Sequence, residues 1–78
     1  MFGNTYELST AGFLAAATTE SRRLAGHVRL LKTAKARGNV GGARLALRKA
    51  TDSADRIDSL LTLATEWAEM DAQHRANA

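Results

Sequence analysis

The stretch "KARGNVGGARLALRKA" (residues 35–50) decides how the chain folds, because it holds the only clear stop signal for a helix. Gly38 suits the left-handed backbone conformation that closes a helix, and Asn39 suits the cap of a following one. Proline is absent from the chain, so no other residue forces an interruption. We therefore expect one domain over residues 1–78, with an N-terminal segment 1–9, a helix 10–37, a turn 38–39 and a helix 40–75.

The spacing of apolar and small residues predicts how the two helices pack. In each expected helix such residues recur in alternating steps of four and three, which is the heptad pattern of a coiled-coil seam. Folding at the turn places large residues opposite small ones in most layers. The sequence predicts an all-α fold, a long antiparallel two-helix hairpin. Its expected seam is Thr10, Leu14, Ala17, Ser21, Leu24, Val28, Leu31 and Lys35 against Ala43, Leu47, Ala50, Ala54, Ile57, Leu61, Ala64 and Ala68.

A second apolar stripe lies outside this seam, near the open end of the hairpin. Exposed contiguous apolar residues are typical of an interface, so we expect self-association into a four-helix bundle or a larger helical oligomer. Alternatively, residues 1–9 fold back over Trp67 and cover part of the stripe within one chain. The number of subunits and their relative orientation stay open. The expected oligomer interface consists of Phe13, Leu60, Leu63, Trp67 and Met70.

Charge is strongly segregated along the chain, although the net charge is only +3. Nine basic residues and no acidic residue lie between Arg22 and Lys49. Such a cluster favours an anionic partner, nucleic acid or a nucleotide. It could instead meet the acidic 52–71 stretch of a neighbouring copy and so orient an assembly. A membrane surface is disfavoured, because the tip has few bulky apolar residues. The expected anion-binding residues are Arg29, Lys32, Lys35, Arg37, Arg44, Arg48 and Lys49.

Gly41 and Gly42 suggest a backbone phosphate site in the first turn of the second helix. Amide N–H groups there have no partner within the helix, and the helix dipole is positive. The simpler interpretation is that these glycines only let the two arms approach closely. We favour the structural interpretation.

Catalytic and metal-binding patterns are lacking in the sequence. Cysteine is absent, and His27 and His74 are the only histidines. Neither histidine has a carboxylate pair at a spacing that would build an acid–base or metal site. Asp52, Asp55 and Asp58 recur every three residues and are interpreted as a solvated helix face. We expect no enzyme, no metal and no cofactor.

Composition favours a cytoplasmic protein. No cysteine indicates a reducing compartment, no apolar run approaches the length of a membrane span, and the N-terminus lacks the basic region of a signal peptide. The expected function is a small bacterial or phage regulator: a non-enzymatic helical module that self-associates and binds an anionic partner through its basic tip. The alternative is a structural or adaptor protein whose charge segregation directs assembly with itself or with an acidic protein.

Overall fold

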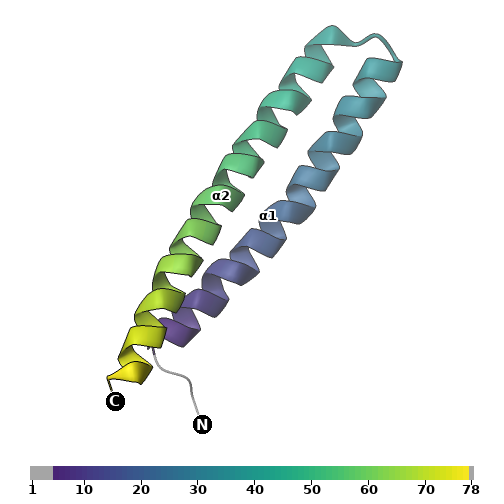
Figure 1. Ribbon diagram of the computed structural model, residues 1–78. Coiled ribbons are helices and arrows are strands. Elements are labelled where there is room, and N and C mark those ends of the chain that lie inside the picture. Colours follow the sequence, from purple (N-terminus) through teal and green to yellow (C-terminus); the bar gives the residue numbers. More distant parts are fainter. Residues whose placement is uncertain (1–4, 78) are drawn as a thin grey trace.

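The computed structural model describes residues 5–77 and contains two long helices. Helix α1 spans Thr5–Ala36 and helix α2 spans Val40–Ala76. They run antiparallel and pack against each other along their length (Figure 1). The molecule is a narrow rod that measures 60 × 21 × 12 Å between Cα extremes. The predicted all-α helical hairpin is therefore confirmed.

The turn between the helices is built by Gly38 and Asn39. Gly38 has a φ of 68°, the left-handed conformation that glycine adopts without strain. The Asn39 N–H donates to the Ala34 carbonyl at 2.9 Å, and the Gly38 N–H donates to the Lys35 carbonyl at 3.1 Å. These two bonds form a Schellman motif, which satisfies the last carbonyls of α1. The Asn39 side chain then caps α2 by accepting from the Gly42 N–H at 2.9 Å.

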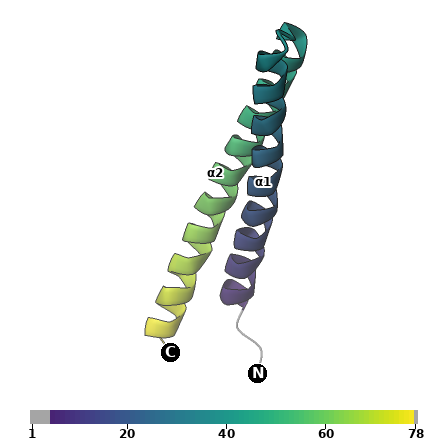
Figure 2. The same ribbon diagram turned by 90° about the vertical axis from the view of Figure 1, so that its right-hand side faces the viewer.

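The two helices wind around each other. In Figure 1 they lie side by side near the turn and overlap near the chain ends. In Figure 2, turned by 90°, they overlap near the turn and lie side by side near the ends. Winding is what a sustained seven-residue repeat produces, because a straight helix would rotate its seam away from its neighbour.

The seam keeps the predicted rhythm, but half of its positions are shifted by one residue. Alternate members of the predicted seam, such as Ala17 and Ala50, do face the partner helix. The other members lie beside the seam, and all of them except Val28 are exposed. Each is replaced by the residue that precedes it. The buried and half-buried seam is Tyr6, Thr10, Phe13, Ala17, Glu20, Leu24, His27, Leu31 and Ala34 of α1 with Ala43, Ala46, Ala50, Ser53, Ile57, Leu60, Ala64, Trp67 and Asp71 of α2.

Aromatic burial explains the shift. The observed register turns Phe13 and Trp67 inward, where their ring centroids lie 6.3 Å apart. The predicted register would bury Leu14 and Ala68 in their place, and the charged Lys35 in place of Ala34. Burial of large rings contributes more than burial of smaller side chains. At the turn end the seam holds alanines, including Ala34 and Ala46, which let the helices approach closely.

Helix α1 begins at Thr5, five residues before the expected start. Thr10 does not cap the helix, since its hydroxyl donates to the Tyr6 carbonyl at 2.8 Å. Tyr6 instead lies in the seam and contacts Trp67, with ring centroids 5.6 Å apart. Residues 5–9 thus do not fold back over Trp67 as the alternative expected, because they continue α1, which brings Tyr6 to Trp67. Residues 1–4 lie outside the described part. Helix α2 ends at Ala76, one residue beyond the expected end.

Candidate anion-binding tip

The seven expected anion-binding residues surround the turn end of the hairpin. All seven are exposed. They lie on every side of the rod rather than in one row, since the heptad positions of these residues differ. Lys32, Lys35 and Arg44 belong to one flank of the seam, and Arg37 and Lys49 to the other. Arg29 and Arg48 lie on the outer faces of α1 and α2.

No carboxylate neutralises these seven cations within residues 5–77. The ion pairs of this part of the chain involve only Arg23, Arg56 and Arg75. Arg75 pairs with Asp71 and Glu7 at the open end of the hairpin, far from the turn. The tip is therefore a concentrated positive charge whose field extends into solvent for about 10 Å at moderate ionic strength.

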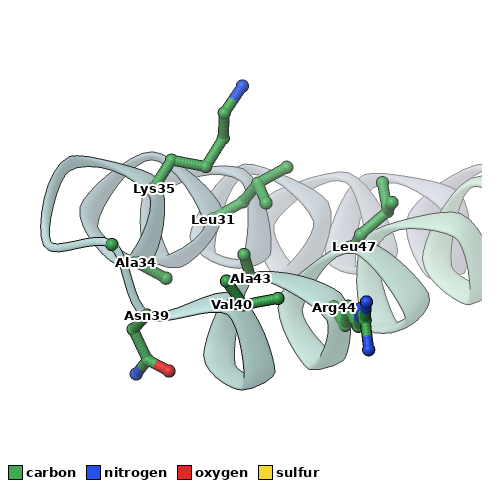
Figure 3. Close-up of a pocket in the computed structure, with 9 residues that line it drawn as sticks. Leu31, Ala34, Lys35, Asn39, Val40, Ala43, Arg44 and Leu47 are labelled. Atoms are coloured by element: carbon green, nitrogen blue, oxygen red, sulfur yellow. The ribbon is translucent and has the colours of Figure 1, made fainter.

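An apolar hollow of about 540 Å³ opens beside the turn (Figure 3). The side chains of Leu31 and Leu47 rise from the two helices toward the same side, whereas Asn39 points away. Lys35 and Arg44 stand at its edge, so the hollow combines an apolar floor with a cationic border. It is lined by Leu31, Ala34, Lys35, Gly38, Asn39, Val40, Ala43, Arg44 and Leu47.

The two glycines of α2 differ in how they contact the Asn39 side chain that caps the helix. The Gly42 N–H already donates to the Asn39 side chain, so an anion at that amide would displace the cap. A Cβ at Gly42 would lie 2.6 Å from the Asn39 amide nitrogen, whereas a Cβ at Gly41 would meet nothing closer than 3.9 Å. Gly42 thus makes room for the Asn39 cap, a role that differs from the expected close approach of the two arms.

A buried carboxylate lies at the middle of the hairpin, and sequence reasoning missed it. Glu20 is 5% exposed and faces Ser53, which is fully buried. The Ser53 hydroxyl donates to Glu20 Oε1 at 3.1 Å, and Arg56 Nη1 donates to the same oxygen at 2.8 Å. Arg23 Nη1 donates to Oε2 at 3.1 Å. The carboxylate is thus bonded from both helices, which fixes their register.

The pKa of the Glu20 carboxyl is lowered, primarily because Arg56 donates a hydrogen bond to it. Burial opposes this shift, while the Ser53 hydroxyl and the charges of Arg23 and Arg56 add to it. Glu20 is therefore ionised at neutral pH. The heptad spacing contains a signal for this cluster. Glu20 follows Phe13 by seven residues, so a seam that includes Phe13 also includes Glu20.

The five expected interface residues do not form one surface. Trp67, Phe13 and Leu60 are half-buried in the seam of the hairpin itself. Leu63 and Met70 lie outside it, with 38% and 37% of their surface exposed. Large exposed apolar side chains occur elsewhere, chiefly Leu8, Leu14, Leu30, Val40, Leu45, Leu47 and Leu61.

The two histidines lie in different parts of the hairpin, and neither belongs to a metal-binding group among the described residues. His27 is half-buried in the seam. His74 contacts Tyr6 near the open end, where their ring centroids lie 5.7 Å apart. Asp52, Asp55 and Asp58 are exposed. Among residues 5–77 no group of three or more histidine or acidic side chains is placed to hold a metal ion. Neither helix carries an apolar stretch that could cross a membrane, for the residues described.

Comparison of the chain with protein-family models, with curated proteins and with solved structures finds no match. The arguments below therefore rest on the geometry and the charges of the hairpin.

Proposed function

We propose that this protein is a small non-enzymatic helical module that self-associates and binds an anionic partner, nucleic acid or a nucleotide, through its basic tip, in a regulatory role. The observation that carries the proposal is the contrast in ion pairing. Arg23, Arg56 and Arg75 are paired with carboxylates, whereas the seven tip cations have no such pair within residues 5–77. Like charges held together repel, and phosphates would remove that repulsion and release counterions.

The distribution of the cations supports contact with a phosphate backbone. They surround the tip, and no aromatic side chain stands among them on which a base could stack. Such a surface neutralises phosphates without reading base sequence. We therefore expect binding that is insensitive to sequence and falls steeply with added salt.

A matched pair of double variants tests the proposal. R48Q/K49Q removes two charges from the tip, and S59E/T62E changes the net charge by the same amount at exposed positions of α2 away from it. Binding to a fluorescent DNA duplex is measured by anisotropy across a salt series. For R48Q/K49Q we expect weaker binding and a log–log salt slope shallower by about two. Equal losses in both variants would mean that only net charge matters and would contradict a tip site.

A structural or adaptor function is the second candidate, and the mixed character of the tip hollow favours it. An apolar floor bordered by Lys35 and Arg44 suits an acidic amphipathic protein segment. Native mass spectrometry of the purified protein separates the two functions, because it reports the number of subunits and any retained nucleotide or nucleic acid together. An oligomer that never carries nucleic acid and shows no salt-dependent DNA binding would favour the adaptor function.

A further inference from the structure

The two flanks of the seam differ, and one of them is almost entirely apolar. One flank consists of residues that come directly after every second seam residue, and we name it the leucine side. It comprises Leu14, Ser21, Val28 and Lys35 of α1 with Val40, Leu47, Ala54, Leu61 and Ala68 of α2. The leucines and Val40 on it are 44% to 61% exposed. Both the tip hollow and a second shallow hollow at Leu14, Leu61 and Ala68 open on this side. The leucine side is thus a continuous unpartnered apolar face.

The exposed area of the chain exceeds that of a compact globular protein of the same mass. The protein exposes 5810 Å², whereas a compact globular protein of its 8.4 kDa mass would expose about 4,600 Å². The difference exceeds the roughly 800 Å² that each partner buries in a standard protein–protein interface. Within residues 5–77 all five buried apolar residues are alanines, so the hairpin seam alone buries little side-chain surface.

The order of residues along the leucine side is symmetric about its middle. On α1 the apolar Leu14 and Val28 flank the small Ser21 at equal distances, with Lys35 one repeat beyond Val28 and Glu7, outside the leucine side, one repeat before Leu14. On α2 Leu47 and Leu61 flank Ala54 in the same way. Ser21 and Ala54 lie at the same height, because their neighbours Glu20 and Ser53 are hydrogen-bonded to each other. A two-fold axis at this height would therefore place Leu47 of one copy opposite Leu61 of the other and Leu14 opposite Val28, so that apolar residues meet apolar residues across the axis.

Charge decides the orientation of the two copies. In a face-to-face pair with opposite directions, Lys35 of one copy lies at the height of Glu7 of the other, twice by symmetry. In a pair with the same direction, the two basic tips would lie side by side and repel. The Glu7 side chain is 53% exposed and accepts from Arg75.

We propose that a second copy of the chain covers the leucine side, face to face and in the opposite direction, in a four-helix assembly centred on Ser21 and Ala54. The two basic tips then lie at opposite ends of the assembly. This inference rests on the self-association in the proposed function, but it does not depend on nucleic-acid binding by the tip.

Leu47→Glu and Leu45→Glu form a matched pair that tests the surface. Leu47 is on the leucine side and Leu45 is not, although both are leucines of one helix with 55% and 52% of their surface exposed. Mass is measured by sedimentation equilibrium, and helix content by circular dichroism. We expect a monomer for Leu47→Glu, with helix retained, and a wild-type mass for Leu45→Glu. Leu61→Glu is the second leucine-side variant and is expected to behave like Leu47→Glu.

The failures of the two proposals are distinguishable in this experiment. A wild-type protein that is monomeric at all concentrations would overturn self-association, and the inference with it. A dimeric Leu47→Glu variant beside a dimeric wild type would overturn only the leucine-side interface. DNA binding by the tip is measured separately and can persist in either case.

Single cysteines test the orientation, since the chain has none of its own. With copies in opposite directions, Ser21→Cys and Ala54→Cys each lie near the two-fold axis and form a disulfide with their own copy upon oxidation. With copies in the same direction, α1 lies over α2 of the partner, so the two variants cross-link only when mixed. Self-linking of each variant is expected, and linking only in the mixture would overturn the opposite orientation.

Discussion

The two flanks of the hairpin seam differ in how far the side chains of the same two helices cover the seam from solvent. The leucine side carries no acidic residue between Leu14 and Leu61 on either helix. The opposite flank, which we name the arginine side, consists of Ala16, Arg23, Leu30 and Arg37 with Gly42, Lys49, Arg56, Leu63 and Met70. Arg23 and Arg56 reach from it over the seam to the buried Glu20, while their side chains remain 62% and 60% exposed.

It follows from this difference that one set of residues covers the seam within the hairpin, and another set provides the surface for contact between hairpins. On the arginine side, long side chains cover the seam with their aliphatic stems and keep their charges in water. On the leucine side, short branched side chains leave the seam edge open to solvent. A partner is therefore expected on the leucine side and not on the arginine side.

The largest expected effect comes from reversing a charge on the arginine side. Arg56→Glu places a second carboxylate against Glu20 and removes its strongest hydrogen-bond donor. We expect the thermal unfolding midpoint, followed by circular dichroism, to fall on the order of 10 °C. Arg48→Glu is the control, because Arg48 is exposed and makes no ion pair within residues 5–77. Equal falls in both variants would mean that Glu20 is not the centre of the effect.

Acid should weaken the hairpin through Glu20. Its pKa is lowered in the folded state, so the unfolded chain takes up the proton first, and stability is lost as the pH falls below about 4.5. Glu20→Gln cannot titrate at this position. We expect the wild type to unfold at a higher temperature than Glu20→Gln at pH 7, and the gap to narrow between pH 5 and pH 3. A gap that stays constant across this range would contradict the ionised cluster.

Protein concentration should affect stability only while the leucine side is intact. Association stabilises the folded state by mass action, so the unfolding midpoint of the wild type should rise by a few °C for each tenfold increase in concentration. Leu47→Glu should lose this dependence, and Leu45→Glu should keep it. If the unfolding midpoint of the wild type does not change with concentration, association through the leucine side is contradicted, and the two flanks do not differ in function.

The smallest effect is expected at the tip, where the two flanks meet. Gly41→Ala adds a methyl group with no neighbour closer than 3.9 Å and should stabilise α2 by about 0.5–1 kcal/mol. Gly42→Ala should gain nothing, because its Cβ would push the Asn39 side chain off the cap. Chemical denaturation measures both. Loss of DNA binding in Gly41→Ala would support the hypothesis that the backbone binds a phosphate at this glycine.

The sequence was sufficient for the hairpin and its turn, because Gly38 and Asn39 each have a specific backbone role. It was insufficient for the exact faces of the helices. Leu14 and Phe13 are adjacent, and both satisfy a heptad rhythm; only the joint packing of Phe13, Tyr6 and Trp67 decides between them. That same choice brings Glu20 into the seam, where apolar periodicity gives no reason to expect it. Exposed charges such as those of the tip are easily located from sequence, since helix faces and the turn already place them.

The turn at Gly38 and Asn39 also gives the chain a simple order of folding. The pairs of residues that meet near the turn are close in sequence, so bringing them together costs little loop entropy. Each further layer toward the open end then adds to contacts already made, and α1 and α2 can close from the turn toward Tyr6 and His74. Contacts of this kind give fast folding. Changes at the turn should therefore slow folding, whereas changes at the open end should mainly speed unfolding.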